Sequence, residues 1–166
     1  MLYLFLVNHP LSGTRFFELK RKLLNAIGYS IGSGTKVVGP IFNSGTLKIG
    51  DNCWIGRNLE INGNGAVTIG DNCDLAPDII FLTGGHALGN LSRRAGVGET
   101  YQINVGDGVW VGARATIGRN VKIGSGSVIA ACACVMQDIA PNTLVGGVPA
   151  KVIKELDHAS AQNTTK

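Results

Sequence analysis

The stretch that decides the fold is Val105–Val135, which reads VGDGVWVGARATIGRNVKIGSGSVIAACACV. Every sixth residue from Val105 onward is a large β-branched side chain, and we call these positions anchors: Val105, Val111, Ile117, Ile123, Ile129 and Val135. A period of six is neither the 3.6 of a helix nor the 2 of an isolated strand. It is typical of a parallel β-helix, in which each hexad forms one short strand and one turn and three hexads complete a triangular coil.

The residues around the anchors agree with that coil. Glycine follows the first four anchors, where the chain must turn a corner. The position two residues before each anchor should also face inward, close to a corner where only small or slim side chains fit. It holds Val109, Ala115, Val121, Ser127 and Ala133. A glycine-rich β-sandwich, the alternative, would show this spacing only by accident.

The same frame extends upstream and predicts a solenoid over residues 31–149. It begins at Ile31 and Val37, and we expect the glycine- and proline-containing segment 39–45 to bulge as a loop. The frame resumes at Ile49, Ile55 and Ile61; two extra residues near 62–65 then shift it to Ile69, Leu75 and Phe81. Insertions of this kind map to corner loops.

The ends of the chain should cover the solenoid. Residues 1–30 form the N-terminal part, with an irregular lead-in to residue 13 and a short capping helix over 14–27. That helix would present Phe16, Leu19, Leu23 and Ile27, start at Thr14 and stop at Gly28. Residues 150–166 form the C-terminal part, for which we predict a short helix at 150–157 and then a polar tail.

Between Phe81 and Val105 the six-residue frame fails. A regular scaffold has no need of so long an excursion, and such loops commonly carry function. The insertion, residues 82–104, holds His86, whereas the other two histidines, His9 and His158, lie near the chain ends. A histidine in an exposed loop can equally have no role.

Composition narrows the possible partners and the compartment. The formal net charge of +4, without a dense basic run, disfavours nucleic acid as a partner. The apolar run Leu2–Val7 is too short to span a membrane and lacks the basic start of a signal peptide, so we expect a cytoplasmic protein.

The four cysteines show no zinc-binding spacing, and we predict no metal site. Cys53 and Cys73 are each two residues before an anchor, so they should stack on adjacent rungs about 4.8 Å apart. A disulfide between them is conceivable, but buried free thiols are the favoured interpretation in a reducing compartment.

Three segments resemble one known family. VGDGVWVG at Val105–Gly112 resembles the "IGDNVWIG" block of hexapeptide-repeat acyltransferases, and PNTLVGGVPAKVI at Pro141–Ile153 resembles their closing "PPNTVVAGNPAKVI". TGGH at Thr83–His86, followed by Arg93, looks like the active-site loop of the galactoside, maltose and capsular-sugar O-acetyltransferase branch. The resemblance covers roughly residues 14–157.

That resemblance implies a left-handed parallel β-helix, a homotrimer with active sites between subunits, and acetyl-CoA as donor to a sugar or polysaccharide-precursor hydroxyl. It implies that His86 is the general base, a role suited to a neutral imidazole. On the cofactor side it implies that the backbones of Ala113 and Ala131 meet the pantetheine arm and that Lys151 and Lys154 lie near the CoA phosphates. Trp110 precedes an anchor and should point outward, where it would either flank the same groove or cover a trimer contact.

The acceptor side departs from the family pattern. Where the galactoside enzymes use an asparagine to position the sugar, this chain has Gly56, with Asn58 two residues on. Trp54 and Asn64 align with acceptor-contacting aromatic and acidic positions. Arg93 and Arg94 are candidates for an anionic group, or can equally be solvated side chains without a role. The alternatives are therefore an acyltransferase with a non-sugar acceptor and a non-catalytic trimeric β-helix scaffold.

Overall fold

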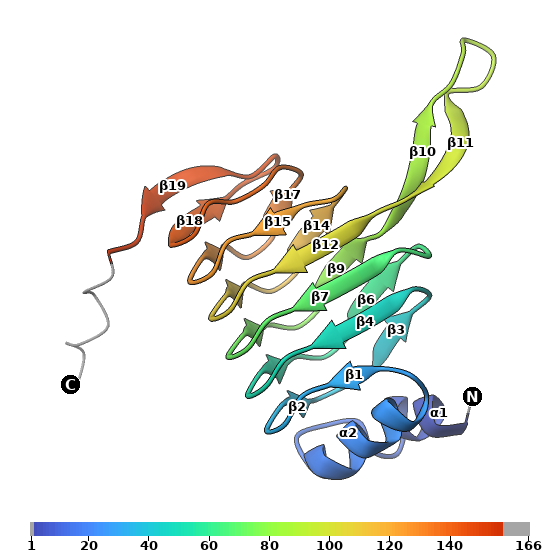
Figure 1. The fold of residues 1–166 in the computed structure, drawn as a ribbon, viewed down its shortest axis with the longest axis vertical. Helices are drawn as coiled ribbons and strands as arrows, with labels where there is room; N and C mark the ends of the chain where they lie inside the picture. Colours follow the sequence, from blue (N-terminus) through green and yellow to red (C-terminus); the bar gives the residue numbers. More distant parts are fainter. Residues whose placement is uncertain (1, 158–166) are drawn as a thin grey trace.

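The computed structural model describes residues 2–157 and shows a triangular solenoid with an extended arm (Figure 1). Its walls are three sheets, in which every strand runs parallel to its neighbours except β19. Sheet A contains β1 (Ser30–Ile31), β4 (Thr46–Ile49), β7 (Ala66–Ile69), β12 (Gln102–Val105) and β15 (Lys122–Ile123). Sheet B contains β2 (Lys36–Val37), β5 (Trp54–Ile55), β8 (Asp74–Leu75), β13 (Trp110–Val111), β16 (Val128–Ile129), β18 (Thr143–Gly146) and β19 (Lys151–Glu155). Sheet C contains β3 (Ile41–Asn43), β6 (Leu59–Asn62), β9 (Ile80–Leu82), β14 (Thr116–Gly118) and β17 (Cys134–Val135).

The coil is left-handed, as the resemblance implied. The front strands of Figure 1 run toward the left while the chain climbs. Strand pairing repeats at eighteen residues, as in Ile31 with Ile49 and Val105 with Ile123. It lengthens to twenty between Ile49 and Ile69, which confirms the two-residue excess near 62–65.

The anchors fill the interior as predicted. All six anchors between Val105 and Val135 are at most 4% exposed, and the five residues two positions before them from Val109 to Ala133 are at most 1% exposed. Each rung therefore contributes one large and one small inward side chain per wall. Stacked at the strand spacing of a sheet, these side chains form one continuous core.

The stacked cysteines match their prediction. Cys53 and Cys73 are both buried free thiols on adjacent rungs. The backbone N–H of Cys73 donates to Sγ of Cys53 at 3.3 Å, and each thiol donates to a carbonyl of the next rung at 3.1 Å.

The predicted loop at 39–45 is wrong, because β3 occupies it and pairs with β6. The six-residue frame continues unbroken through Asn43, which takes the place of an apolar anchor. Its amide is accommodated because Oδ1 accepts the N–H of Gly45 at 2.9 Å and the amide also bonds to the Tyr29 hydroxyl. Because this anchor position holds a polar residue, the sequence pattern did not predict the first complete coil.

The N-terminal cap holds two helices, α1 (Leu2–Asn8) and α2 (Phe17–Ala26), so the expected irregular lead-in is wrong. Helix α2 starts after Phe16 rather than at Thr14, and it buries Lys20 and Leu24 while Leu19 stays exposed. Asparagine side chains join the cap to the first coil. Asn8 bonds both backbone groups of Ile41, and Asn25 does the same for Ile31, which satisfies polar groups on the open edge.

The predicted C-terminal helix is also wrong. Residues 151–155 form β19, which runs antiparallel to β18 and pairs Leu144 with Lys154. The reason is that β18 is the last parallel strand of its sheet, and a helix after it would leave its outer N–H and C=O groups without backbone partners. The predicted tail beyond residue 157 lies outside the described residues.

Candidate active site

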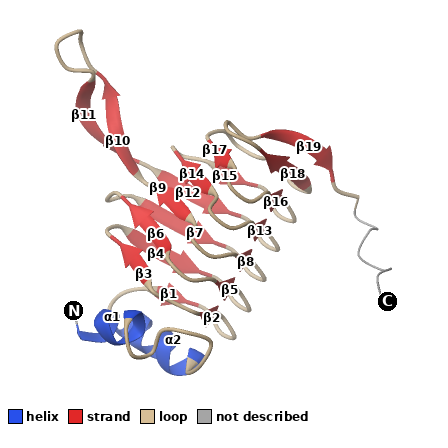
Figure 2. Cartoon of the chain, turned by 180° about the vertical axis from the view of Figure 1, so that it is seen from behind, coloured by secondary structure: helices blue, strands red, loops and turns tan. Residues whose placement is uncertain are grey.

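The insertion forms an arm, residues 84–100, that projects from the solenoid (Figures 1 and 2). Strands β10 (Gly84–Leu88) and β11 (Ala95–Thr100) pair antiparallel, so the segment expected as a loop is a two-stranded ribbon. It leaves the coil between β9 and β12, at the corner where sheet C passes into sheet A. We call this the C–A corner.

His86 lies near the base of the arm, on β10, with its ring exposed. Nδ1 is 2.9 Å from the carbonyl oxygen of Gly96. Because a carbonyl oxygen only accepts, Nδ1 carries the proton in the neutral ring and Nε2 keeps its lone pair. The cross-strand partner of His86 is Gly98, where a Cβ would meet no atom within 4 Å. The ring is thus oriented as a base beside open space.

A polar cluster that the sequence did not reveal supports the base of the arm. The Tyr101 hydroxyl, on a buried side chain, donates to Glu99 Oε2 at 2.9 Å. Arg119 approaches the same oxygen at 3.9 Å and lies 5.7 Å over the Tyr101 ring. A Cβ at Gly85 would collide with the Tyr101 hydroxyl, so this glycine lets the strand carrying His86 pack closely on the cluster.

The residues implied for the cofactor lie elsewhere on the coil. Ala113 and Ala131 occupy the corner between sheets B and C on consecutive rungs, and we call this the B–C corner. The N–H of Cys132 donates to the Ala113 carbonyl at 2.9 Å, while Ala131 faces solvent. Trp110 points outward from β13 and is 57% exposed, as predicted, and Lys151 and Lys154 are exposed on β19.

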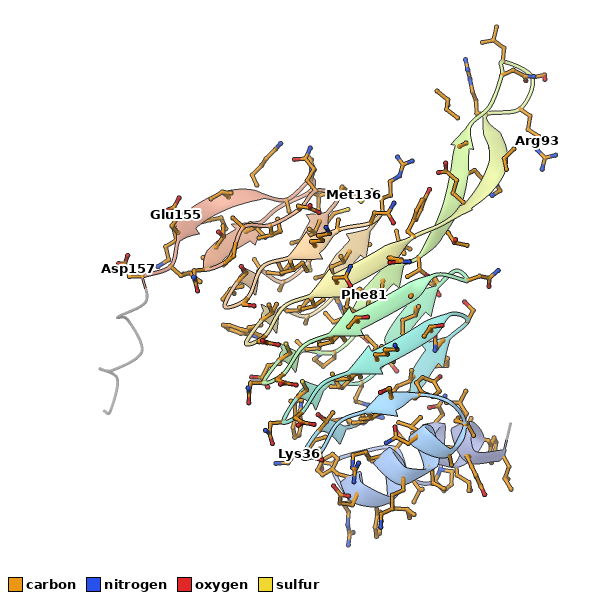
Figure 3. All side chains as sticks on the ribbon, viewed as in Figure 1. Lys36, Phe81, Arg93, Met136, Glu155 and Asp157 are labelled. Carbon is orange, nitrogen blue, oxygen red and sulfur yellow. The ribbon has the colours of Figure 1, made fainter. Side chains whose placement is uncertain are left out.

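The residues implied for the acceptor divide between these places. Trp54, 36% exposed on β5, meets the Phe17 ring edge-on at 5.7 Å, and Asn58 at the B–C corner donates to Asp78 Oδ1 at 2.8 Å. Asn64 lies at the C–A corner. Figure 3 shows Arg93 at the far end of the arm.

One copy of the chain therefore separates the predicted site residues into two groups. His86, Asn64 and Arg93 belong to the C–A corner and its arm, whereas the other seven lie on sheet B or at the B–C corner. The strands of sheet C run between the two corners. Four or five extended residues at about 3.3 Å each place the corners roughly 15 Å apart.

Within residues 2–157, no three His, Cys, Asp or Glu side chains gather closely enough to hold a metal ion. Neither of the two helices in this range is long and apolar enough to cross a membrane.

Comparison with known proteins adds independent information. The family model described as bacterial transferase hexapeptide (six repeats) matches residues 103–136, and the model described as hexapeptide repeat of succinyl-transferase matches residues 46–76. The galactoside O-acetyltransferase of Escherichia coli K12 is 33% identical over 159 residues, covering 95% of this chain and 76% of the relative.

Two solved structures share the fold over nearly the whole chain. A hexapeptide-repeat containing acetyltransferase of Vibrio cholerae O1 biovar eltor, complexed with acetyl-CoA, has a TM-score of 0.81 at 29% identity, covering 94% of this chain and 84% of that one. A galactoside acetyltransferase in complex with coenzyme A has a TM-score of 0.75 at 31% identity, covering 94% and 78% respectively.

Proposed function

Because the chain belongs to the hexapeptide-repeat acyltransferase family, in the branch of the galactoside O-acetyltransferases, we propose that it transfers acetyl from acetyl-CoA to a hydroxyl of a sugar or polysaccharide precursor. That it is an acetyl-CoA-dependent acyltransferase follows from the family. The observation that carries the proposal furthest is the orientation of His86, whose Nδ1 bonds to Gly96 and whose Nε2 is left free. Acetyl-CoA is an intracellular metabolite, so the proposed compartment is the cytoplasm.

His86 acts as general base in the proposed reaction. Nε2 takes the proton of the acceptor hydroxyl as its oxygen attacks the thioester carbonyl carbon; the C–O bond forms and the C–S bond breaks. The departing CoA thiolate takes the proton back from the imidazolium. No covalent enzyme intermediate is required, because holding both substrates in one groove supplies much of the rate through orientation.

We further propose that the arm of one copy reaches the B–C corner of a neighbour in a homotrimer. Two features of the single chain support this. The residue implied for catalysis and most of those implied for the cofactor lie at different corners of one copy. In a closed, symmetric assembly the arm of each copy can reach the B–C corner of the next, and every such contact is equivalent. The arm also exposes Leu88, Leu91 and Val97 by 84%, 86% and 81%, an apolar surface that an adjacent copy would cover.

The groove residues have separate proposed roles. Backbone groups at Ala113 and Ala131 face the pantetheine chain, with Trp110 beside it, and backbone N–H groups there donate to the developing oxyanion. Lys151 and Lys154 attract the CoA phosphates across solvent. Trp54, Asn58, Asn64 and Arg93 are the proposed acceptor contacts.

Thermal stability with acetyl-CoA tests the donor without knowledge of the acceptor. At a hundred times its dissociation constant the ligand should add about 2.7 kcal/mol to the free energy of unfolding and raise the melting point. Lys151→Ala should weaken this shift, whereas Lys48→Ala, an exposed lysine on sheet A, should leave it intact. No shift at millimolar acetyl-CoA would favour the alternative of a non-catalytic scaffold.

Release of the CoA thiol then identifies the acceptor class. Sugars, polysaccharide precursors and simple alcohols are compared as acceptors with the wild-type protein. Turnover confined to non-sugar alcohols would replace the sugar proposal with the second alternative.

A further inference from the structure

The outward face of sheet B carries a column of side chains whose centre has an unusual composition. Asp74 on β8 pairs in register with Trp54 below it and with Trp110 above it. In all three strands the first residue points outward and the second is a buried anchor. Because adjacent strands of a sheet lie about 4.8 Å apart, one carboxylate lies between two indoles. The chain contains only two tryptophans, and both flank Asp74.

The Asp74 carboxylate has no hydrogen bond or ion pair with any side chain in the part of the chain that the structure describes. Its rung neighbours are aromatic. The closest cation along the column is Lys36, two rungs away on the far side of Trp54. Beyond Trp110 the column continues with Val128 and Leu144, which bring no charge.

An unpaired carboxylate between two indoles suits a cation. A tryptophan face attracts an ammonium group within about 6 Å of its centre, and the carboxylate adds direct charge complementarity and a strong hydrogen bond. A neutral hydroxyl compound would use the indoles and part of the carboxylate, whereas an anionic group would be repelled. Only a cationic ligand uses all three side chains.

The column also lies where the proposed reaction takes place. Trp54 and Trp110 are proposed contacts of acceptor and donor, and each immediately precedes an anchor and the turn into the B–C corner. The edge-on contact with Phe17 of α2 holds the Trp54 ring from the side. A ligand bound at Asp74 would therefore lie between Trp54, the proposed acceptor contact, and Trp110, the proposed donor contact.

We propose that Asp74 is a specificity-determining residue and that the acceptor is a hydroxyl compound carrying an ammonium group, such as an amino sugar or an amino alcohol. Arg93, the candidate for an anionic group, then takes no part in holding the ammonium group. The inference rests on the proposed function, since it deepens the identity of the acceptor. It also explains how the chain can have Gly56 where the galactoside enzymes have an asparagine. The Asp74 carboxylate can hold the acceptor in place of that asparagine.

Tryptophan fluorescence reports this column directly. We would titrate the full-length protein with glucosamine, glucose and glucuronate at a pH where the amine is protonated. Glucosamine should bind at least about tenfold more tightly than glucose, and glucuronate least tightly. Asp74→Asn should reduce the glucosamine preference to about twofold or less. Glu60→Gln, which removes an outward carboxylate from sheet C, should leave the preference unchanged.

Several outcomes would overturn the inference. These are equal affinity for glucosamine and glucose, a preference that survives Asp74→Asn, and no response to any of the three sugars. A change in particle mass by light scattering in Asp74→Asn would also overturn it, since the carboxylate would then pair with a second copy. Measuring the acetyl-CoA melting shift on the same samples separates the two ideas: a normal shift without amine preference rejects this inference alone, and no shift in the wild type rejects the proposed function.

Discussion

The solenoid and the arm obey different constraints, although they are continuous in the chain. In the coil, every anchor from Val105 to Val135 is at most 4% exposed and has a rung neighbour of similar kind. In the arm, Leu88, Leu91 and Val97 are all more than 80% exposed, and His86 faces solvent. The coil is determined by packing within the chain, whereas packing within the chain does not explain the exposed apolar side chains of the arm. Substitutions should therefore affect stability in the coil and chemistry in the arm.

The largest expected effect is on catalysis by the arm. His86→Ala should lower the turnover number by about 10²–10⁴-fold, because it removes the proposed base. The melting point should change by about one degree at most, since the exposed ring has one hydrogen bond to lose. His9→Ala, an exposed histidine on the N-terminal cap, is the control and should keep full activity. Unchanged acetyl transfer in His86→Ala would reject the base assignment.

The coil should show the opposite behaviour. Phe81→Ala removes a fully buried anchor and should cost about 3–5 kcal/mol of the free energy of unfolding. Thermal denaturation should show a melting point lower by about 10 °C, while the turnover number per folded molecule is retained. Phe42→Ala removes the same side chain from the outward face of sheet C and should cost less than about 1 kcal/mol. Equal losses at Phe42 and Phe81 would contradict the one-sided packing of the coil.

A substitution at the junction of coil and arm should lower the turnover number less than the loss of His86 does. Tyr101→Phe removes the hydroxyl that bonds Glu99 and should lower the turnover number by about tenfold, because the strand carrying His86 loses support. The Michaelis constant for acetyl-CoA should not change, since the proposed donor groove lies at another corner. Tyr29→Phe, which removes the hydroxyl that joins the end of the cap to Asn43 of β3, should alter the melting point but not the turnover number. A rise in the Michaelis constant with an unchanged turnover number in Tyr101→Phe would contradict this role.

A comparably small effect should come from the cap that closes the coil. The buried ammonium of Lys20 donates to the Gly13 carbonyl at 2.6 Å, and Lys20→Met should cost about 1–2 kcal/mol because it leaves that carbonyl without this partner. Burial lowers the pKa of Lys20 to about 8. The unfolded chain therefore binds the proton more tightly than the folded one between that pKa and the ordinary 10.5. The melting point of the wild type, relative to Lys20→Met, should rise as the pH increases through this window; a fall would show that the charged form is the stabilising one.

The coil could be predicted from the sequence more fully than the arm. The six-residue frame predicted the coil, the inward small residues and the stacking of Cys53 on Cys73, because one wall position repeats on every rung. It failed where a polar side chain replaced an anchor at Asn43, and it gave no indication that edge pairing would make Lys151–Glu155 a strand. Both errors depend on contacts between distant residues, which no local pattern encodes.

The candidate site was less accessible to prediction. The insertion itself marked His86, but the Tyr101–Glu99–Arg119 cluster lies outside the anchor positions. It forms because Arg119, one coil further on, reaches Glu99 and the Tyr101 ring. Asp74 follows no motif either. Its significance depends on the register that places it between Trp54 and Trp110. The roles of the predicted site residues stay predictions.

The most direct test of the account is a mixed assembly, because its central claim is that arm and groove come from different copies. His86→Ala carries a defective arm, and Ala131→Trp carries a blocked groove at an exposed corner. Each should be inactive alone. Denatured together in equal amounts and refolded, the two should recover about a quarter of the wild-type activity, the share of interfaces at which an intact arm meets an intact groove in a random trimer. No recovery, in mixtures shown by mass to contain both chains, would place the whole site within one copy and contradict the account.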